Sequence, residues 1–147
     1  MQSKKIFYFH SRKLPSIGSK AKLTQHLLDI FKAERIELES LSIILISDQE
    51  LIKINKQYLK HDYYTDILTF ELNGENAPVW AEIYISLDRV KENAKTFKIF
   101  YRDELLRVII HGILHLCGYK DGITAQKNKM SKLETKYLYK YVSRETS

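Results

Sequence analysis

The sequence is poor in the residues that build several common classes of small protein. Its 147 residues include one cysteine, Cys117, two prolines and five glycines. A single thiol cannot form an internal disulfide, so a disulfide-stapled secreted scaffold is excluded. The glycines are dispersed, which excludes a P-loop and a dinucleotide-binding fingerprint. No apolar run approaches the roughly 18 residues that a membrane span requires, and none follows the basic N-terminus as in a signal peptide. We therefore predict a cytoplasmic protein without a membrane segment.

The composition is that of an ordinary globular protein. Hydrophobic residues make up 44% of the chain and charged residues 29%, a balance typical of folded domains. The length predicts a single domain over residues 1–147. The formal net charge of +6 permits a polyanionic partner such as nucleic acid, but a solvated lysine-rich surface produces the same charge.

The spacing of apolar residues predicts four strands and five helices. Strands are indicated at residues 5–10, 36–46, 66–72 and 79–85. Helices are indicated at residues 19–35, from 47 to the polar connection at 60–64, 86–97, about 102–117 and 124–143. This order predicts an α/β (α+β) domain in which a small mixed four-stranded sheet packs with about five helices.

Three local features add detail to this prediction. The short link at residues 73–76 predicts antiparallel pairing of the last two strands. Ser47 and Glu50 form a capping box. The apolar end of the second strand, formed by Leu41 and residues 43–46, predicts burial on both faces of the sheet there.

A pair of histidines carries the chemistry. His111 and His115 are four residues apart on a predicted buried helix, so their side chains share one face and can bind one metal ion. Gly118 allows the chain to leave the helix with a positive φ and to return Asp121 as a third ligand. Three protein ligands leave a position for water, which is the catalytic pattern. The alternative is two core histidines satisfied by hydrogen bonds.

The residue after the first histidine argues against a peptidase. Metalloproteases of the HExxH type use a glutamate at that position as general base. Gly112 occupies it here, so peptidase chemistry is disfavoured.

The metal segment resembles the signature of the YbeY family, bacterial metal-dependent endoribonucleases of ribosomal RNA maturation. The matching run is His-Gly-Ile-Leu-His-Leu-Cys-Gly-Tyr, residues 111–119. Two further blocks are similar to the family, at residues 54–70 and, more weakly, 81–85. Lys120 and Asp121 stand where the family usually has Asp-His.

This resemblance implies a metal in a cleft beside the central buried helix, held by His111, His115 and Asp121. Zn²⁺ is the expected ion, with Mn²⁺ or Mg²⁺ as alternatives because a carboxylate is a harder ligand than the usual histidine. It also implies hydrolysis of single-stranded RNA at the 3′ end of small-subunit ribosomal RNA, with roles in ribosome assembly and quality control. The ribosomal small subunit is the implied partner.

One family residue is missing. The arginine that follows the family's tyrosine aligns with Leu59, which cannot grip or stabilise a phosphate. Lys60 and His61 are the first candidates to replace it, with ordinary solvated loop residues as the alternative. Other candidates for phosphate contact or support of the site, each with an ordinary structural role as its alternative, are Thr65, Asp66 and Glu82. The substitution makes a non-catalytic, metal-stabilised ribosome-assembly factor an alternative function. A metallohydrolase of another substrate is a separate alternative, which Gly112 disfavours where that substrate is a peptide.

Basic and aromatic residues could hold RNA. No acidic residue occurs among residues 1–23, which include Lys4, Lys5, Arg12, Lys13, Lys20 and Lys22. Further lysines lie along the last predicted helix, where a solvated face is the alternative. Candidates for stacking on unpaired bases are Tyr63, Tyr64 and Tyr119, whereas Tyr137, Tyr141 and Cys117 are predicted to pack in or around the core.

Overall fold

The computed structural model describes residues 4–59 and 65–146. The elements, in chain order, are β1 (Ile6–His10), α1 (Lys20–Ala33), β2 (Leu38–Ile46), α2 (Asp48–Leu59), β3 (Ile67–Glu71), β4 (Val79–Ser86), α3 (Leu87–Phe97), α4 (Tyr101–Leu116) and α5 (Thr124–Thr146). They agree with the predicted elements apart from a few residues at their ends. The α/β fold with one mixed sheet and five helices is therefore confirmed.

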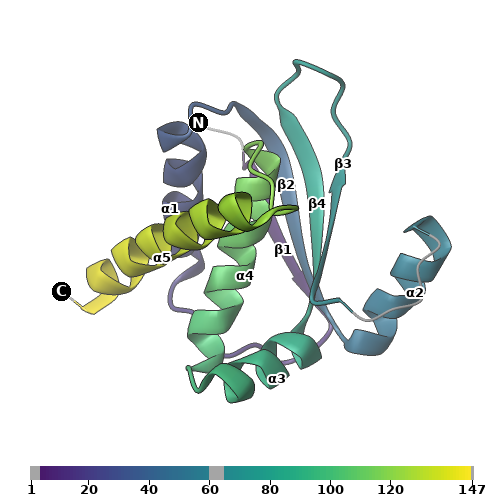
Figure 1. Cartoon of the computed structure of the whole chain (residues 1–147), viewed down its shortest axis with the longest axis vertical. Helices are drawn as coiled ribbons and strands as arrows, with labels where there is room; N and C mark the ends of the chain where they lie inside the picture. The colour runs from purple at the N-terminus through teal and green to yellow at the C-terminus, as the bar shows by residue number, and fades with distance from the viewer. Residues whose placement is uncertain (1–3, 60–64, 147) are drawn as a thin grey trace.

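The sheet has the strand order β1-β2-β4-β3. β1, β2 and β4 are parallel neighbours, and β3 pairs antiparallel with β4, as the short link predicts. Helices α1, α4 and α5 lie on one side of this sheet and α2 lies on the other (Figure 1). Because β3 and β1 are the edge strands, each has a neighbour on one side only.

The main core lies between α4 and one face of the sheet. α4 is buried over most of its length because apolar residues occur all round it. Ala81, Ile83 and Ile85 of β4 point toward α4, while Tyr84 belongs to a smaller cluster under α2. The predicted burial of β2 on both faces holds where Ile46 enters this smaller cluster.

The ends of the helices follow local sequence signals. The Ser47 side chain accepts a hydrogen bond from the Glu50 backbone N–H at 3.1 Å, and the Glu50 carboxylate accepts one from the Ser47 N–H at 3.2 Å. This reciprocal pair is the predicted capping box, which satisfies two N–H groups that a helix start otherwise leaves without partners. Within the part of the chain that the structure describes, no helix combines the length and the apolar character needed to cross a bilayer.

A candidate metal centre at the end of the central helix

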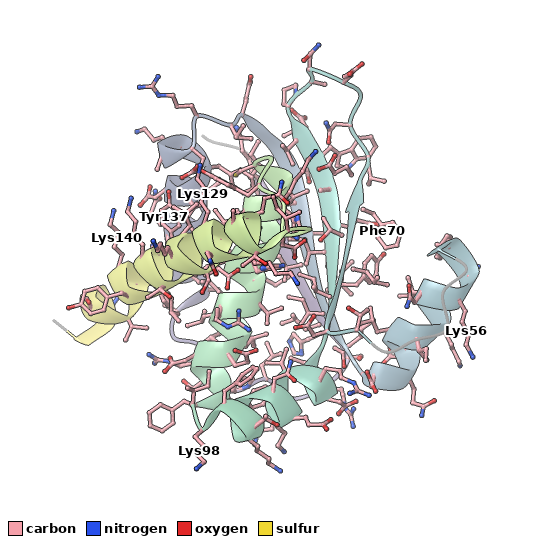
Figure 2. The ribbon with its side chains drawn as sticks, viewed as in Figure 1. Lys56, Phe70, Lys98, Lys129, Tyr137 and Lys140 are labelled. Carbon is pink, nitrogen blue, oxygen red and sulfur yellow. The ribbon has the colours of Figure 1, made fainter. Side chains whose placement is uncertain are left out.

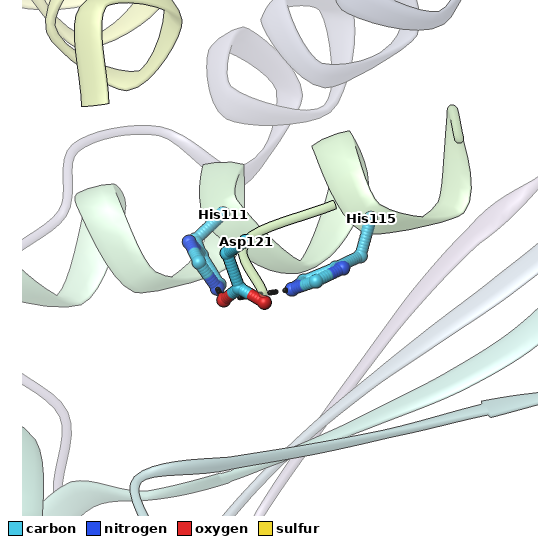
Figure 3. A group of neighbouring side chains, drawn as sticks. All are labelled: His111, His115 and Asp121. Carbon is cyan, nitrogen blue, oxygen red and sulfur yellow. Dashed lines mark ion pairs between the residues drawn. The ribbon is translucent and has the colours of Figure 1, made fainter. Parts of the chain in front are cut away.

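The C-terminal half of α4 presents His111 and His115 toward a common point. Their rings are 4.8 Å apart at an angle of 80°, and both Nε2 atoms face the same carboxylate oxygen (Figure 3). Asp121 Oδ2 lies 3.5 Å from His111 Nε2 and 3.4 Å from His115 Nε2. Ligand atoms around a tetrahedral zinc ion with bonds of about 2.0–2.1 Å are about 3.3–3.4 Å apart. These three side chains could therefore hold one ion.

The end of α4 explains how Asp121 reaches the histidines. Gly118 has a φ of +102°, a left-handed conformation that glycine adopts without strain. Its N–H donates to the His115 carbonyl at 3.0 Å, and the Tyr119 N–H donates to the Leu114 carbonyl at 3.1 Å. These two bonds make a Schellman motif, which ends the helix and reverses the chain. The reversal brings the loop that carries Asp121 back under the histidine face.

The loop is also tied to two other helices. The Tyr119 hydroxyl donates to Glu34 at the end of α1 at 2.6 Å, and Tyr137 of α5 donates to the other oxygen of the same carboxylate. The hydrogen bond to Glu34 raises the pKa of Tyr119 to about 12. Lys129 Nζ lies 5.5 Å from the centre of the Tyr119 ring. Both the hydroxyl and one ring face of Tyr119 are thus engaged within the protein.

The surroundings of α5 match the sequence prediction for its aromatic residues. Tyr137 and Tyr141 are 4% and 2% exposed, so both belong to the core. Figure 2 shows Lys129 and Lys140 flanking Tyr137 along this helix. The Lys140 ammonium lies 6.0 Å from the Tyr137 ring centre.

A buried carboxylate contacts the far side of His111. Glu134 of α5 is 4% exposed, and its Oε2 lies 2.6 Å from His111 Nδ1. If Nδ1 carries the proton and donates it to Glu134, the Nε2 lone pair is directed at the common point. Carboxylates hold metal-binding histidines in this way and fix their tautomer and orientation.

Arg107 links this carboxylate to a second one. Its guanidinium donates through Nη1 to Glu134 at 2.7 Å, and through Nε and Nη2 to both oxygens of Glu104 at 2.8 Å. Glu104 has no exposed surface. The hydrogen bonds to Glu104 are the largest influence on the pKa of Arg107 and raise it, although burial opposes them.

Glu134 is not among the site residues predicted from the sequence. A signal was present in its spacing, since Glu134 interrupts a stripe of buried α5 residues formed by Met130, Tyr137 and Tyr141. A lone acid in a core stripe indicates a buried partner.

The pKa of the His111 imidazole and the pKa of the Cys117 thiol are shifted by different causes. Burial lowers the pKa of His111, but the hydrogen bond and charge of Glu134, helped by the charges of Asp121 and Asp66, outweigh it and raise that pKa. Burial raises the pKa of the Cys117 thiol to about 12. A thiol that remains protonated at neutral pH is a poor ligand, and Cys117 packs against the core as predicted.

The other predicted site residues, Thr65, Asp66 and Glu82, have different positions relative to the histidines. Thr65 precedes β3 and its hydroxyl donates to the Ile67 carbonyl at 3.3 Å, and Asp66 acts electrostatically on His111. Glu82 lies on the opposite face of the sheet from α4, because Ile83 next to it points toward α4, and it accepts a hydrogen bond from Tyr84 at 3.2 Å. A supporting role for Glu82 at the histidines therefore does not fit its position.

Four of the predicted residues have no described structure. Lys60 and His61, the candidates to replace the family arginine, lie outside the described residues, as do Tyr63 and Tyr64.

His115 borders an open hollow. It has a volume of about 500 Å³ and is lined by His115 and by β3, with Ile67, Thr69 and Glu71 among its residues. Since β3 is an edge strand, this side of the site is accessible from outside. This hollow lies where the sequence predicts a cleft beside the central helix.

The residue between the histidines explains why the HExxH glutamate is absent. A Cβ atom on Gly112 would lie 2.9 Å from Cδ1 of both Ile67 and Ile83. Position 112 therefore faces the sheet, and α4 approaches β3 and β4 more closely than a side chain there permits. A glutamate at 112 would be directed into the core.

We expect Gly112→Ala to lower the free energy of unfolding by about 1 kcal/mol. Overpacking a core costs about 1–3 kcal/mol, and the better helix propensity of alanine returns about 1 kcal/mol of that loss. Urea denaturation followed by circular dichroism measures the change. Gly74→Ala is the matched control, because an added Cβ there meets no atom within 4 Å. Equal midpoints for the two variants would contradict close packing at Gly112.

The chain is similar to known proteins in both sequence and structure. A family model described as endoribonuclease YbeY matches residues 10–142. An endoribonuclease YbeY of Cytophaga hutchinsonii is 39% identical over 130 residues, which cover 88% of this chain and 91% of that protein. The one from Karelsulcia muelleri is 47% identical over 102 residues, 69% of this chain and 72% of that protein. The solution structure of TM1509 from Thermotoga maritima superposes with a TM-score of 0.63 and 30% identity, covering 96% of this chain and 91% of that one.

Proposed function

The chain belongs to the YbeY family of endoribonucleases, and we propose that it cleaves single-stranded RNA at a metal centre formed by His111, His115 and Asp121. The observation that carries the proposal is the convergence of the two Nε2 atoms on one carboxylate oxygen at distances that suit a single ion. The open hollow beside His115 supports it, because a phosphodiester can approach there.

Each residue has a defined task in this proposal. A divalent ion supplies Lewis-acid polarisation of a phosphoryl oxygen and lowers the pKa of a coordinated water toward neutrality. His111 and His115 provide neutral imidazole nitrogens, and Asp121 provides a charged oxygen. Glu134 keeps the proton of His111 on Nδ1, so that Nε2 is free to bind. Zn²⁺ is the proposed ion because imidazole suits it, while the carboxylate leaves Mn²⁺ and Mg²⁺ as alternatives.

The proposed substrate is ribosomal RNA. By resemblance to its family, the protein matures the 3′ end of small-subunit ribosomal RNA and acts in ribosome assembly and quality control, with the small subunit as its partner and the cytoplasm as its location. We also propose that residues 1–147 act as one domain.

A second candidate function follows from one substitution. Leu59 stands where the family has an arginine, so a phosphate-stabilising cation is missing at that position. A protein that binds metal and RNA but cuts slowly would then serve as a ribosome-assembly factor.

We expect the purified protein to cleave a single-stranded oligoribonucleotide, to lose this activity in a chelator, and to regain it when Zn²⁺ or Mn²⁺ is added back. His115→Ala should abolish both cleavage and stoichiometric metal, as measured by elemental analysis and gel electrophoresis. His10→Ala is the control, because His10 is the last residue of β1 and its side chain contacts the Arg12 backbone carbonyl instead of the candidate metal ligands. Metal and RNA binding without cleavage would favour the assembly factor. Absence of metal binding under all conditions would refute both functions.

A further inference from the structure

A second hollow, larger than the one beside the histidines, lies at the other edge of the sheet. It has a volume of about 1090 Å³ and runs between α1 and β1. In the strand order β1-β2-β4-β3, β1 is the edge opposite to β3. The hollow is therefore separate from the metal centre, which borders β3. We call it the α1–β1 groove, and its lining includes Lys4, Lys5, Tyr8, Lys20, Thr24 and Lys32.

The charge of the α1–β1 groove is strongly positive. Four lysines and one aspartate line it, so the lining carries three net positive charges. All four lysines are exposed. The aspartate, Asp29, accepts a hydrogen bond from the Gln25 amide at 2.9 Å, which partly satisfies its oxygens. A concave surface with cations on both walls concentrates anions.

One hydrogen bond joins the two walls of the groove. Tyr8 of β1 and Thr24 of α1 share a hydrogen bond of 2.8 Å between their hydroxyls, which joins the two walls. Phe7 and Phe9 alternate with Tyr8 along β1, so their rings point to the other face of the sheet, where Phe9 pairs with Ile44 beside the smaller cluster. The groove is therefore a basic track, and lysines in such a track can contact the phosphates of a nucleic acid backbone.

We propose that the α1–β1 groove is a second RNA-binding site, which lies apart from the metal centre. It binds the sugar-phosphate backbone of a single-stranded segment of the substrate. The proposal relies on RNA being the substrate of the proposed function. Lysines on both walls favour a partner with a regular row of negative charges, such as the RNA of the proposed function, over an acidic peptide. Such a site also compensates in affinity for the phosphate contact that Leu59 cannot make.

Charge neutralisation tests the proposal. The variant Lys5→Gln, Lys20→Gln and Lys32→Gln removes three charges from the groove, and glutamine keeps side-chain length and helix propensity. The control is Lys53→Gln, Lys91→Gln and Lys95→Gln, three exposed lysines on α2 and α3 that change the net charge equally. The dissociation constant of a fluorescent 20-nucleotide single-stranded RNA is measured by anisotropy between 50 and 200 mM KCl, with a chelator present so that the RNA stays intact.

We expect the groove variant to bind about 10–100-fold more weakly at 0.1 M salt, and the slope of log K against log salt to fall by about 2, because each phosphate contact on a single strand contributes about 0.7 to it. The control variant should retain the wild-type slope. Zinc binding and cleavage of a short oligonucleotide should be unchanged in both, which separates this proposal from the metal centre. Equal losses in the two variants, or binding of poly-glutamate in preference to RNA, would overturn the proposal.

Discussion

Replacing Arg107 with methionine is expected to lower the free energy of unfolding by about 3–5 kcal/mol, because it leaves two buried carboxylates without a cation. Glu104 has no exposed surface and Glu134 is 4% exposed. Arg107 supplies hydrogen bonds to both at 2.7–2.8 Å. Methionine fills a similar volume but offers no donor, so the carboxylates must take up protons or draw water into the core. Denaturation in urea at pH 7 measures the loss.

An arginine on the same helix gives a matched control. Arg102 forms an ion pair of 3.6 Å with Asp103, and both side chains are about a third exposed. Such surface pairs contribute about 0–1 kcal/mol, so Arg102→Met should have a small effect. A further variant, Arg107→Met with Glu104→Gln and Glu134→Gln, removes the charges together and should recover much of the stability. A loss in Arg107→Met no larger than that in Arg102→Met would contradict a buried network.

Most helices and strands of the fold could be predicted from local sequence signals. The capping box at Ser47 and the alternation around Ile83 depend on residues close together in sequence, and the helices and strands followed from such patterns. The parallel order of β1, β2 and β4 depends on contacts between segments far apart in the chain, which neither periodicity nor capping encodes. The short link at residues 73–76 is the exception, because it restricted β3 and β4 to one pairing.

In the candidate site, too, some residues could be predicted from local spacing and others could not. His111, His115 and Asp121 lie within one helix and the reversal after it, so their spacing was sufficient to predict them. Glu134 contacts His111 from α5 across a helix interface, and no local pattern relates the two positions. Glu82 shows the converse: the alternation of Ala81, Ile83 and Ile85 already assigns it to the face of the sheet away from α4, so its place in a block similar to the family did not bring it near the histidines.

Asp121→Ala is expected to weaken zinc binding by roughly 100-fold or more, since loss even of a supporting contact to a ligand costs 10–100-fold. RNA cleavage should fall in proportion at limiting zinc. The Asp121 side chain is 42% exposed, so the metal-free fold should keep its stability, and denaturation without metal checks this. Competition with a chromophoric chelator measures affinity. Lys120→Ala, in the same loop, should bind zinc like the wild type.

Asp121→His converts the same position to the family's usual residue and tests why this chain differs. An imidazole replaces a charged oxygen, which makes the ligand set softer and less anionic. We expect zinc to be retained and affinity for Mn²⁺ and Mg²⁺ to fall, because these ions prefer carboxylate oxygen. The ratio of cleavage rates in Mn²⁺ and in Zn²⁺ should therefore decrease relative to the wild type. If the variant and the wild type give the same ratio, Asp121 does not bind the ion. The third ligand must then be a residue other than Asp121.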